Sequence, residues 1–226
     1  MKQGISTLLV VHNEEKVIRR CLESIQDVVD EILIIHDGPC NDKTLDICKK
    51  YTKNVFIRPR KTVVAMHLTF LLKKVRYKWV LKIDADESLS KELRNHIRNL
   101  IKNPDADAYS FPWPLWDGKK EVTKNWPRKM ALYRISKISF VGFPHWDDPK
   151  INGKIVNVDF KLEHKTIAGS ASTWRGFVDK GIKKYGPVQA KYTLKEFNEF
   201  DLFQCKEKDF PIQIKIRRKF PLLSAI

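Results

Sequence analysis

The chain of 226 residues carries 43 lysines and arginines against 27 aspartates and glutamates, which gives a formal net charge of +16. Hydrophobic residues make up 42% of the sequence and aromatic residues 11%, far more than a disordered basic tail contains. Nine glycines and eleven prolines without a period exclude a collagen-like chain. We therefore expect a globular protein.

The charge excess is uneven along the chain. Residues 1–110 contain 20 basic and 15 acidic side chains, whereas residues 111–226 contain 23 and 12. A strongly basic second half favours a polyanionic partner, which is nucleic acid, an anionic membrane surface or a phosphorylated small molecule. Composition does not choose among these three.

The cysteines and the apolar runs indicate the compartment. The four cysteines show neither a CxxC pair nor zinc-finger spacing, which favours reduced thiols and a cytoplasmic protein. No apolar run approaches the length needed to cross a bilayer. The apolar residues 5–11 lack a signal-peptide cleavage site and run into charged residues, so we expect a buried strand there.

The first half of the chain alternates short apolar runs with helical patterns. The runs predict strands at 6–11, 31–35, 55–57 and 79–83, and the patterns between and after them predict helices at 14–25, 42–51, 62–75 and 90–101. This alternation is typical of an α/β fold with a Rossmann-like, mostly parallel central sheet flanked by helices. In such sheets ligands bind at the carboxyl ends of the strands.

After residue 107 the pattern becomes mixed. Alternating residues predict strands at 108–113, 129–135 and 155–162, and helical patterns cover 173–185 and 193–203. The last residues, 212–226, fit either a strand or a basic amphipathic tail. Since no linker separates two domains, we expect a single domain, 1–226, with a mixed C-terminal half.

Three predicted strands end in polar side chains. His12-Asn13-Glu14 follows the first strand, His36-Asp37-Gly38 the second and Asp84-Ala85-Asp86 the fourth. Two carboxylates one residue apart suit Mg²⁺ or Mn²⁺ shared with substrate phosphates, although the same acids also favour the start of the following helix. Asp37 suits a hydrogen bond from a base or a ribose, or a plain turn with Gly38. A nicotinamide-binding GxGxxG motif is absent from the sequence.

Together these segments resemble family 2 glycosyltransferases, which have the glycosyltransferase-A (nucleotide-diphospho-sugar transferase) fold. Residues 6–15, Ser-Thr-Leu-Leu-Val-Val-His-Asn-Glu-Glu, are similar to that family's opening strand and its Tyr-Asn-Glu-Glu turn. Residues 31–44 resemble the strand followed by Asp-Asp-Gly-Ser-Thr-Asp, and residues 78–89 resemble the segment with Leu-Asp-Ala-Asp-Glu. Residues 128–134 and 142–148 are similar to the lipopolysaccharide-core glucosyltransferase-like subgroup.

The resemblance implies roles for individual residues. The implied nucleotide-sugar-binding residues are Val11, His12, Glu14, Asp37 and Asp84, the metal ligands for Mn²⁺ or Mg²⁺ are Asp86 and His164, and the catalytic base is Asp147 or Asp148.

Two of these roles have alternatives. A His on a strand is more often structural, so the role of His164 as a metal ligand is the least specific. Asp148 precedes a proline and is tied to backbone geometry, which favours Asp147 as the base, while a plain turn is the alternative for both.

The sequence departs from the family pattern at three places. His36 replaces the first acid of the Asp-Asp pair, which affects base recognition. Residues 39–42 replace Ser-Thr-Asp with one residue more, and Trp146 replaces the Glu that follows the equivalent of His145. The last change affects the assignment of the catalytic base.

The resemblance also implies a reaction. It is a metal-dependent, inverting transfer of a sugar from a UDP-, GDP- or dTDP-linked donor to a glycan, lipid-linked or protein hydroxyl. Residues 1–107 would bind the donor and residues 108–226 the acceptor. The alternatives are a nucleotidyltransferase on a related fold and a basic, non-enzymatic polyanion-binding protein.

The family resemblance also narrows the partners expected for the basic second half of the chain. Its scattered basic residues form no recognition helix, so nucleic acid is not an expected partner. An anionic acceptor, or a peripheral contact of a cytoplasmic protein with an anionic membrane through residues such as Arg217-Arg218-Lys219, fits better. Trp113, Trp116 and Trp126 suit stacking on acceptor sugar rings, with burial in the core as the alternative.

Overall fold

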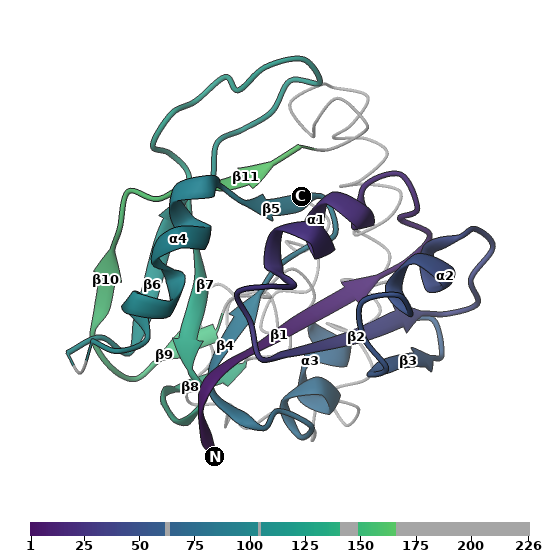
Figure 1. Cartoon of the computed structure of the whole chain (residues 1–226), viewed down its shortest axis with the longest axis horizontal. Coiled ribbons are helices and arrows are strands. Elements are labelled where there is room, and N and C mark those ends of the chain that lie inside the picture. The colour runs from purple at the N-terminus through teal and green to yellow at the C-terminus, as the bar shows by residue number, and fades with distance from the viewer. Residues whose placement is uncertain (62–63, 104, 141–148, 166–226) are drawn as a thin grey trace, which may run out of the picture.

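A seven-stranded sheet forms the centre of the computed structural model, which describes residues 1–61, 64–103, 105–140 and 149–165 (Figure 1). The strand order is β10-β6-β7-β4-β1-β2-β3. The strands are β1 (Lys2–Val11), β2 (Glu31–Asp37), β3 (Val55–Arg58), β4 (Tyr77–Lys82), β6 (Ala108–Pro112), β7 (Arg128–Arg134) and β10 (Ile155–Asn157).

The sheet is parallel on one side and mixed on the other. β1 pairs parallel with both β2 and β4, and β2 pairs parallel with β3. β7 runs antiparallel between β4 and β6, and β10 joins the edge parallel to β6. The result confirms the predicted α/β fold with a mostly parallel sheet and a mixed second half.

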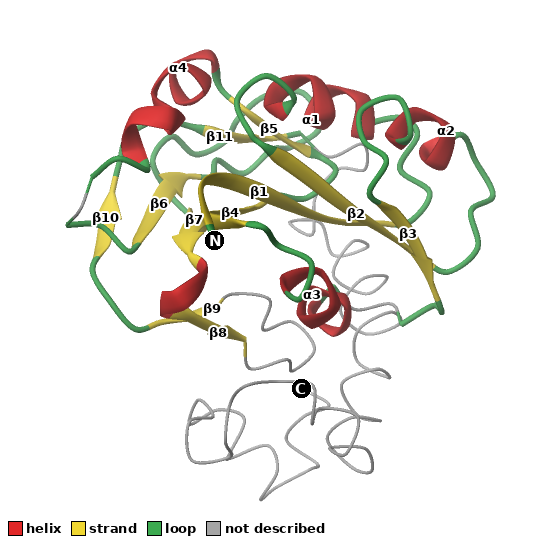
Figure 2. Cartoon of the chain, turned by 60° about the horizontal axis from the view of Figure 1, so that its bottom comes forward, coloured by secondary structure: helices red, strands yellow, loops and turns green. Residues whose placement is uncertain are grey.

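Helices cover both faces of the sheet (Figure 2). The helices α1 (Ile18–Ile25), α2 (Thr44–Cys48) and α4 (Lys91–Leu100) lie on one face, and α3 (Ala65–Leu72) lies on the other. Each face encloses its own hydrophobic cluster, because successive strand residues point to opposite sides: Leu9 packs in the first cluster and Leu8 in the second. Strands buried on both faces explain the continuous apolar runs.

Local sequence explains where the helices lie. In α1, Ile18, Cys21, Leu22 and Ile25 recur at helical spacing, and all four are buried. α4 begins after Ser90, whose Oγ accepts a hydrogen bond from the backbone N–H of Leu93 as a helix cap.

Two short antiparallel pairs lie outside the main sheet. β5 (Glu87–Leu89) pairs with β11 (Leu162–His164), and β8 (Ile138–Phe140) pairs with β9 (Pro149–Ile151). The 3₁₀ turn η1 (Ile135–Lys137) links β7 to β8. β5 follows β4 after only four residues, so the β5–β11 pair stands at the carboxyl end of the parallel strands.

The prediction of one strand over 155–162 is wrong. Its first residues form β10 on the edge of the main sheet, whereas its last residue begins β11 in a different sheet. The backbone N–H of Val158 still donates to the carbonyl of Ser110, but Asp159 is exposed and the chain then leaves the edge. Leu162 is fully buried beside β5, and alternation alone cannot reveal such a change of sheet.

The remaining predictions concern other parts of the chain. The helices expected at 173–185 and 193–203, the end at 212–226 and Cys205 lie outside the described residues. Cys21 and Cys48 are buried free thiols, as expected for reduced cysteines, and burial raises the pKa of Cys48 to about 12. None of the helices in the described part of the chain combines the length and apolar character that crossing a bilayer requires.

The central position of β1 gives a test of the fold. Leu9 is fully buried, so Leu9→Ala leaves a cavity between sheet and helices and should lower the free energy of unfolding by about 2–5 kcal/mol. Ile57 on β3 is 61% exposed, and Ile57→Ala should change it by less than about 0.5 kcal/mol. Urea denaturation measures both, and equal effects would contradict this description of the core.

Candidate active site

The carboxyl ends of β1, β2, β3 and β4 lie at one edge of the sheet. The pairing places Val11 opposite His36, Asp37 opposite Arg58 and Leu8 opposite Lys82. The turns that follow these strands are therefore neighbours in space, as the polar clusters in the sequence predict.

The turn after β1 is tied to the turn after β2. Asn13 has a positive φ of 55°, which asparagine tolerates better than most residues. Its backbone N–H lies 3.3 Å from His36 Nε2, and its Oδ1 accepts a hydrogen bond from the N–H of Asn41. His36 Nδ1 is 2.8 Å from the carbonyl of Gly38. These contacts fit a neutral His36 that accepts at Nε2 and donates at Nδ1, so it joins the two turns without the charge of the acid it replaces.

His12 and Glu14 lie in the same turn. His12 Nδ1 is buried and has no hydrogen-bond partner among the described residues. Burial, helped by the positive charge of Arg60, lowers the pKa of His12 and keeps its ring neutral. The backbone N–H of Glu14 donates to Thr44 Oγ1 at 2.6 Å. The side chain of Val11 belongs to the hydrophobic core, so at this edge Val11 offers its backbone.

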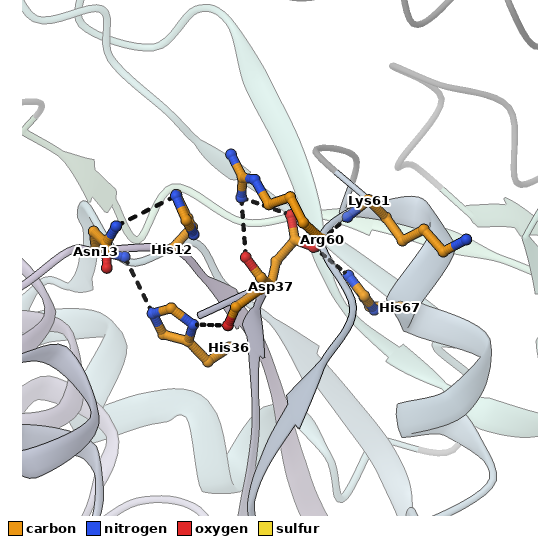
Figure 3. A network of polar contacts seen from close by, with 8 residues as sticks. His12, Asn13, His36, Asp37, Arg60, Lys61 and His67 are labelled. Carbon is orange, nitrogen blue, oxygen red and sulfur yellow. Dashed lines mark hydrogen bonds and ion pairs between the residues drawn. The ribbon is translucent and has the colours of Figure 1, made fainter. Parts of the chain in front are cut away.

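Asp37 is the centre of a basic network (Figure 3). Arg60 Nη1 lies 2.7 Å from its Oδ2, while His67 Nε2 at 2.8 Å and the backbone N–H of Lys61 at 2.6 Å contact its Oδ1. Burial alone would raise the pKa of Asp37, but these hydrogen bonds and charges outweigh it and lower the pKa. Arg58 in turn lies 3.4 Å from His67 Nδ1. Asp37 is thus an ionised carboxylate surrounded by donors.

A second acid organises the loop before α2. Asp42 Oδ1 accepts the backbone N–H of Thr44 at 2.9 Å, and its Oδ2 accepts that of Glu15 at 3.1 Å. These hydrogen bonds outweigh burial and lower the pKa of Asp42 to about 2. The loop that is one residue longer than the family pattern therefore still supports the first turn of α2.

The carboxylate after β4 contacts a lysine whose side chain is mostly buried. Lys129 Nζ, from β7, lies 2.7 Å from Asp84 Oδ2 and 2.6 Å from Glu87 Oε1. Glu87 has no exposed side-chain surface and also accepts the backbone N–H of Asp84 and the indole N–H of Trp113. Burial raises the pKa of Glu87, whereas Lys129 outweighs burial and holds the pKa of Asp84 well below its usual range.

Asp86 faces a histidine from the second half of the chain. The antiparallel pairing of β5 with β11 places His164 opposite Glu87, and His164 Nε2 lies 3.3 Å from Asp86 Oδ2. The imidazole stacks on Trp113 at 4.1 Å between ring centroids. The structure thus brings together Asp86 and His164, the two residues expected to bind the metal, and Trp113 contacts both His164 and Glu87.

Arg20 holds the two segments of that pair together. Its Nη2 donates to the carbonyl of Asp86 at 2.5 Å and to the carbonyl of Lys165 at 3.2 Å. The N–H of Lys165 donates to the same Asp86 carbonyl at 3.0 Å. Helix α1 therefore fixes the turn after β4 against the end of β11.

The residues present fit a divalent metal at Asp86. A carboxylate oxygen and an imidazole nitrogen converge there, and the other nitrogen of His164, Nδ1, is buried without a hydrogen-bond partner among the described residues. Within that part of the chain no three His, Cys, Asp or Glu side chains gather as a complete metal cage. Two protein ligands suit an ion that completes its shell with water and substrate phosphates.

The sequence missed the partners of the predicted acids. Lys129, His67 and Arg60 contact them from other segments, whereas Glu87 belongs to the same Asp-Ala-Asp-Glu motif as Asp84. Asp147 and Asp148 lie outside the described residues, so they stay a prediction. Of the other tryptophans proposed for sugar stacking, Trp126 is 69% exposed.

Comparisons with known proteins identify the family. Residues 6–160 match the model of glycosyl transferase family 2. The chain therefore belongs to glycosyl transferase family 2 and is an enzyme. This result rules out the two alternatives, a nucleotidyltransferase and a non-enzymatic polyanion-binding protein.

Individual relatives share either sequence or fold with the chain. The chain is 33% identical over 210 residues to an uncharacterized glycosyltransferase of Rickettsia typhi, covering 88% of this chain and 71% of that protein. S. aureus TarS 1–349 in complex with UDP has a similar fold, with a TM-score of 0.56 at 14% identity over 100% of this chain and 88% of that one. Glucosyl-3-phosphoglycerate synthase from Mycobacterium tuberculosis, in complex with Mg²⁺ and UDP, gives 0.55 at 15% identity over 87% and 79%. The fold is thus that of glycosyltransferase-A structures.

The lowered pKa of Asp42 gives a pH-dependent prediction. A carboxyl whose pKa is about 2 in the folded state and near 3.8 otherwise stabilises the fold above pH 4, and this contribution is lost as the pH falls toward 2. Asp42→Ala should lower the free energy of unfolding by about 1 kcal/mol at pH 7. The difference in unfolding free energy between Asp42→Ala and the unaltered chain, measured by urea denaturation, should become smaller between pH 4 and pH 2.

Asp42→Asn is the matched control, because the amide keeps an acceptor oxygen but not the charge. Its unfolding free energy should fall less than that of the unaltered chain between pH 4 and pH 2. A gap between Asp42→Ala and the unaltered chain that stays constant down to pH 2 would contradict the assignment.

Proposed function

We propose that the chain is a metal-dependent, inverting glycosyltransferase that uses a nucleotide-diphospho-sugar donor. The observation that carries this proposal is the pair of Asp86 and His164, which converge 3.3 Å apart beside Asp84 at the carboxyl edge of the sheet. The same edge holds the turns after β1 and β2, which is where ligands bind in sheets of this kind.

The donor nucleotide would lie over the turns after β1 and β2. His12 and Glu14, with the backbone of Val11, would line this region, and Asp37 with its basic network would bound it on the side of β3. TarS and the mycobacterial synthase both form complexes with UDP, which supports a UDP-linked donor ahead of GDP- and dTDP-linked ones.

Asp86 and His164 would hold Mn²⁺ or Mg²⁺. Such an ion supplies positive charge that stabilises the departing diphosphate. Asp84, held ionised by Lys129, would contact the ribose or the transferred sugar. The mycobacterial synthase forms its UDP complex with Mg²⁺, and a carboxylate with an imidazole is a donor set that accepts Mn²⁺ as well.

The chain must also remove a proton from the acceptor hydroxyl. In a direct displacement a carboxylate takes this proton while the anomeric centre inverts. Asp147, and next Asp148, are the proposed bases. They stand in the segment that precedes β9, and the rest of the second half would bind the acceptor.

The acceptor is proposed as a glycan, a lipid-linked glycan or a protein hydroxyl. The likeness of residues 128–134 and 142–148 to lipopolysaccharide-core glucosyltransferases supports the first two. The basic second half, with 23 basic against 12 acidic residues, supports an anionic acceptor and a peripheral membrane contact on the cytoplasmic side. The single domain would then divide into a donor half, 1–107, and an acceptor half, 108–226.

A donor panel tests this function. UDP-, GDP- and dTDP-sugars are incubated with the protein and Mn²⁺, and released nucleoside diphosphate is measured. We expect release from at least one donor, its loss with a chelator, and a fall of about 100-fold or more in Asp86→Asn, because a metal ligand is removed.

Asp159→Asn is the matched control, since Asp159 is an exposed acid with a long contact to Arg128. It should leave the release rate within about twofold of the unaltered protein. Full activity of Asp86→Asn, or indifference to the chelator, would refute the metal, and no release from any donor would refute the function.

A further inference from the structure

The lysine beside the carboxyl end of β4 enters the proposed function only as the group that keeps Asp84 ionised. Lys129 comes from β7, its side chain is 10% exposed, and its ammonium lies between the carboxylates of Asp84 and Glu87. The carboxylate of Asp86 is differently placed, since it faces His164. Among the described residues, Asp84 thus pairs with a lysine ammonium, whereas Asp86 pairs with an imidazole.

Burial explains why this arrangement is rigid. A buried ammonium is costly unless ionised acceptors surround it, and here two carboxylates do so at 2.7 and 2.6 Å. Glu87 is itself held by the backbone N–H of Asp84 and by the indole of Trp113, at 2.8 and 2.6 Å. The ammonium is therefore held by Glu87 in contact with Asp84.

The same geometry shows what would happen without the lysine. The buried carboxylate of Glu87 and the partly exposed carboxylate of Asp84 would remain close together, and their combined negative charge would attract any available cation. Mg²⁺ and Mn²⁺ are hard ions that bind carboxylate oxygens. In the unaltered protein the ammonium occupies that position.

We propose that Lys129 is a positioning residue, the fixed counter-cation of Asp84, which keeps this carboxylate out of the metal's coordination shell. Asp86 and His164 are then the ligands that the chain supplies, and Asp84 stays available for the donor. The inference rests on the proposed function in one respect, the divalent metal at Asp86.

The test is a double-mutant cycle on metal affinity, measured without donor. The full chain is titrated with Mn²⁺, and free Mn²⁺ is followed by electron paramagnetic resonance. Lys129→Met should tighten Mn²⁺ binding about tenfold or more, because it removes a positive charge and frees a carboxylate ligand. In an Asp84→Asn background the same change should tighten it less than about threefold, because the freed ligand is missing.

The single variant Asp84→Asn, a ligand variant and a charge control complete the experiment. Asp84→Asn alone should weaken Mn²⁺ binding no more than about threefold, whereas Asp86→Asn should abolish it. Lys161→Met removes a lysine that pairs with Glu121 away from these acids, and it should change the affinity less than about twofold. This control separates the position of Lys129 from the net charge of the protein.

Each possible outcome either supports or overturns the proposed role of Lys129. Weaker or unchanged binding in Lys129→Met, equal tightening in both backgrounds, or no Mn²⁺ binding by either the unaltered protein or Lys129→Met would overturn the inference. If Lys129→Met does not fold in a thermal melt, Asp84→Asn decides alone: retained binding supports the inference and lost binding overturns it. Because the titration contains no donor, its failure is distinct from a donor panel that releases no nucleoside diphosphate.

Discussion

The parallel pairing of β1 with a strand on each side is the constraint on which the rest of the structure depends. β1 joins β2 through six paired positions that end with Val11 opposite His36, and it joins β4 as far as Leu8 opposite Lys82. Because both faces of β1 are buried, a slip of one residue would exchange Leu8 and Leu9 between the two hydrophobic clusters. The register is therefore fixed by packing, and as a result the turns after β1, β2 and β4 lie together at one edge of the sheet.

Compensation of buried charge is the second requirement, and basic side chains from distant segments meet it. Glu31 is buried and paired with Arg76, Asp37 is paired with Arg60, and Lys129 serves two acids at once. These cations come from other segments than the acids that they neutralise. Because each of these cations cancels at least one negative charge, the pairs consume none of the +16 excess, which comes from the remaining basic side chains.

The sequence predicted the fold well because parallel strands and amphipathic helices have periodic local patterns. It placed Asp37, Asp84 and Asp86 at one edge for the same reason, since the polar clusters that contain them come at the ends of apolar runs. It could not predict that Lys129 meets Asp84 or that His67 meets Asp37, because these contacts depend on side chains brought together by strand pairing. The prediction of a single strand at 155–162 failed for the same reason, since alternation indicates which residues are buried but not which sheet they join.

The position of β7 has a consequence for the order in which the protein can assemble. β7 lies between β4 and β6 in the sheet but follows both in the chain, so β6 has no place beside the parallel strands until β7 is inserted. β7 also carries the ammonium that balances Asp84 and Glu87. During synthesis the acids after β4 therefore emerge well before their cation and must stay hydrated until then. One strand thus joins β6 to the parallel strands and brings the cation that offsets part of the negative charge at their edge.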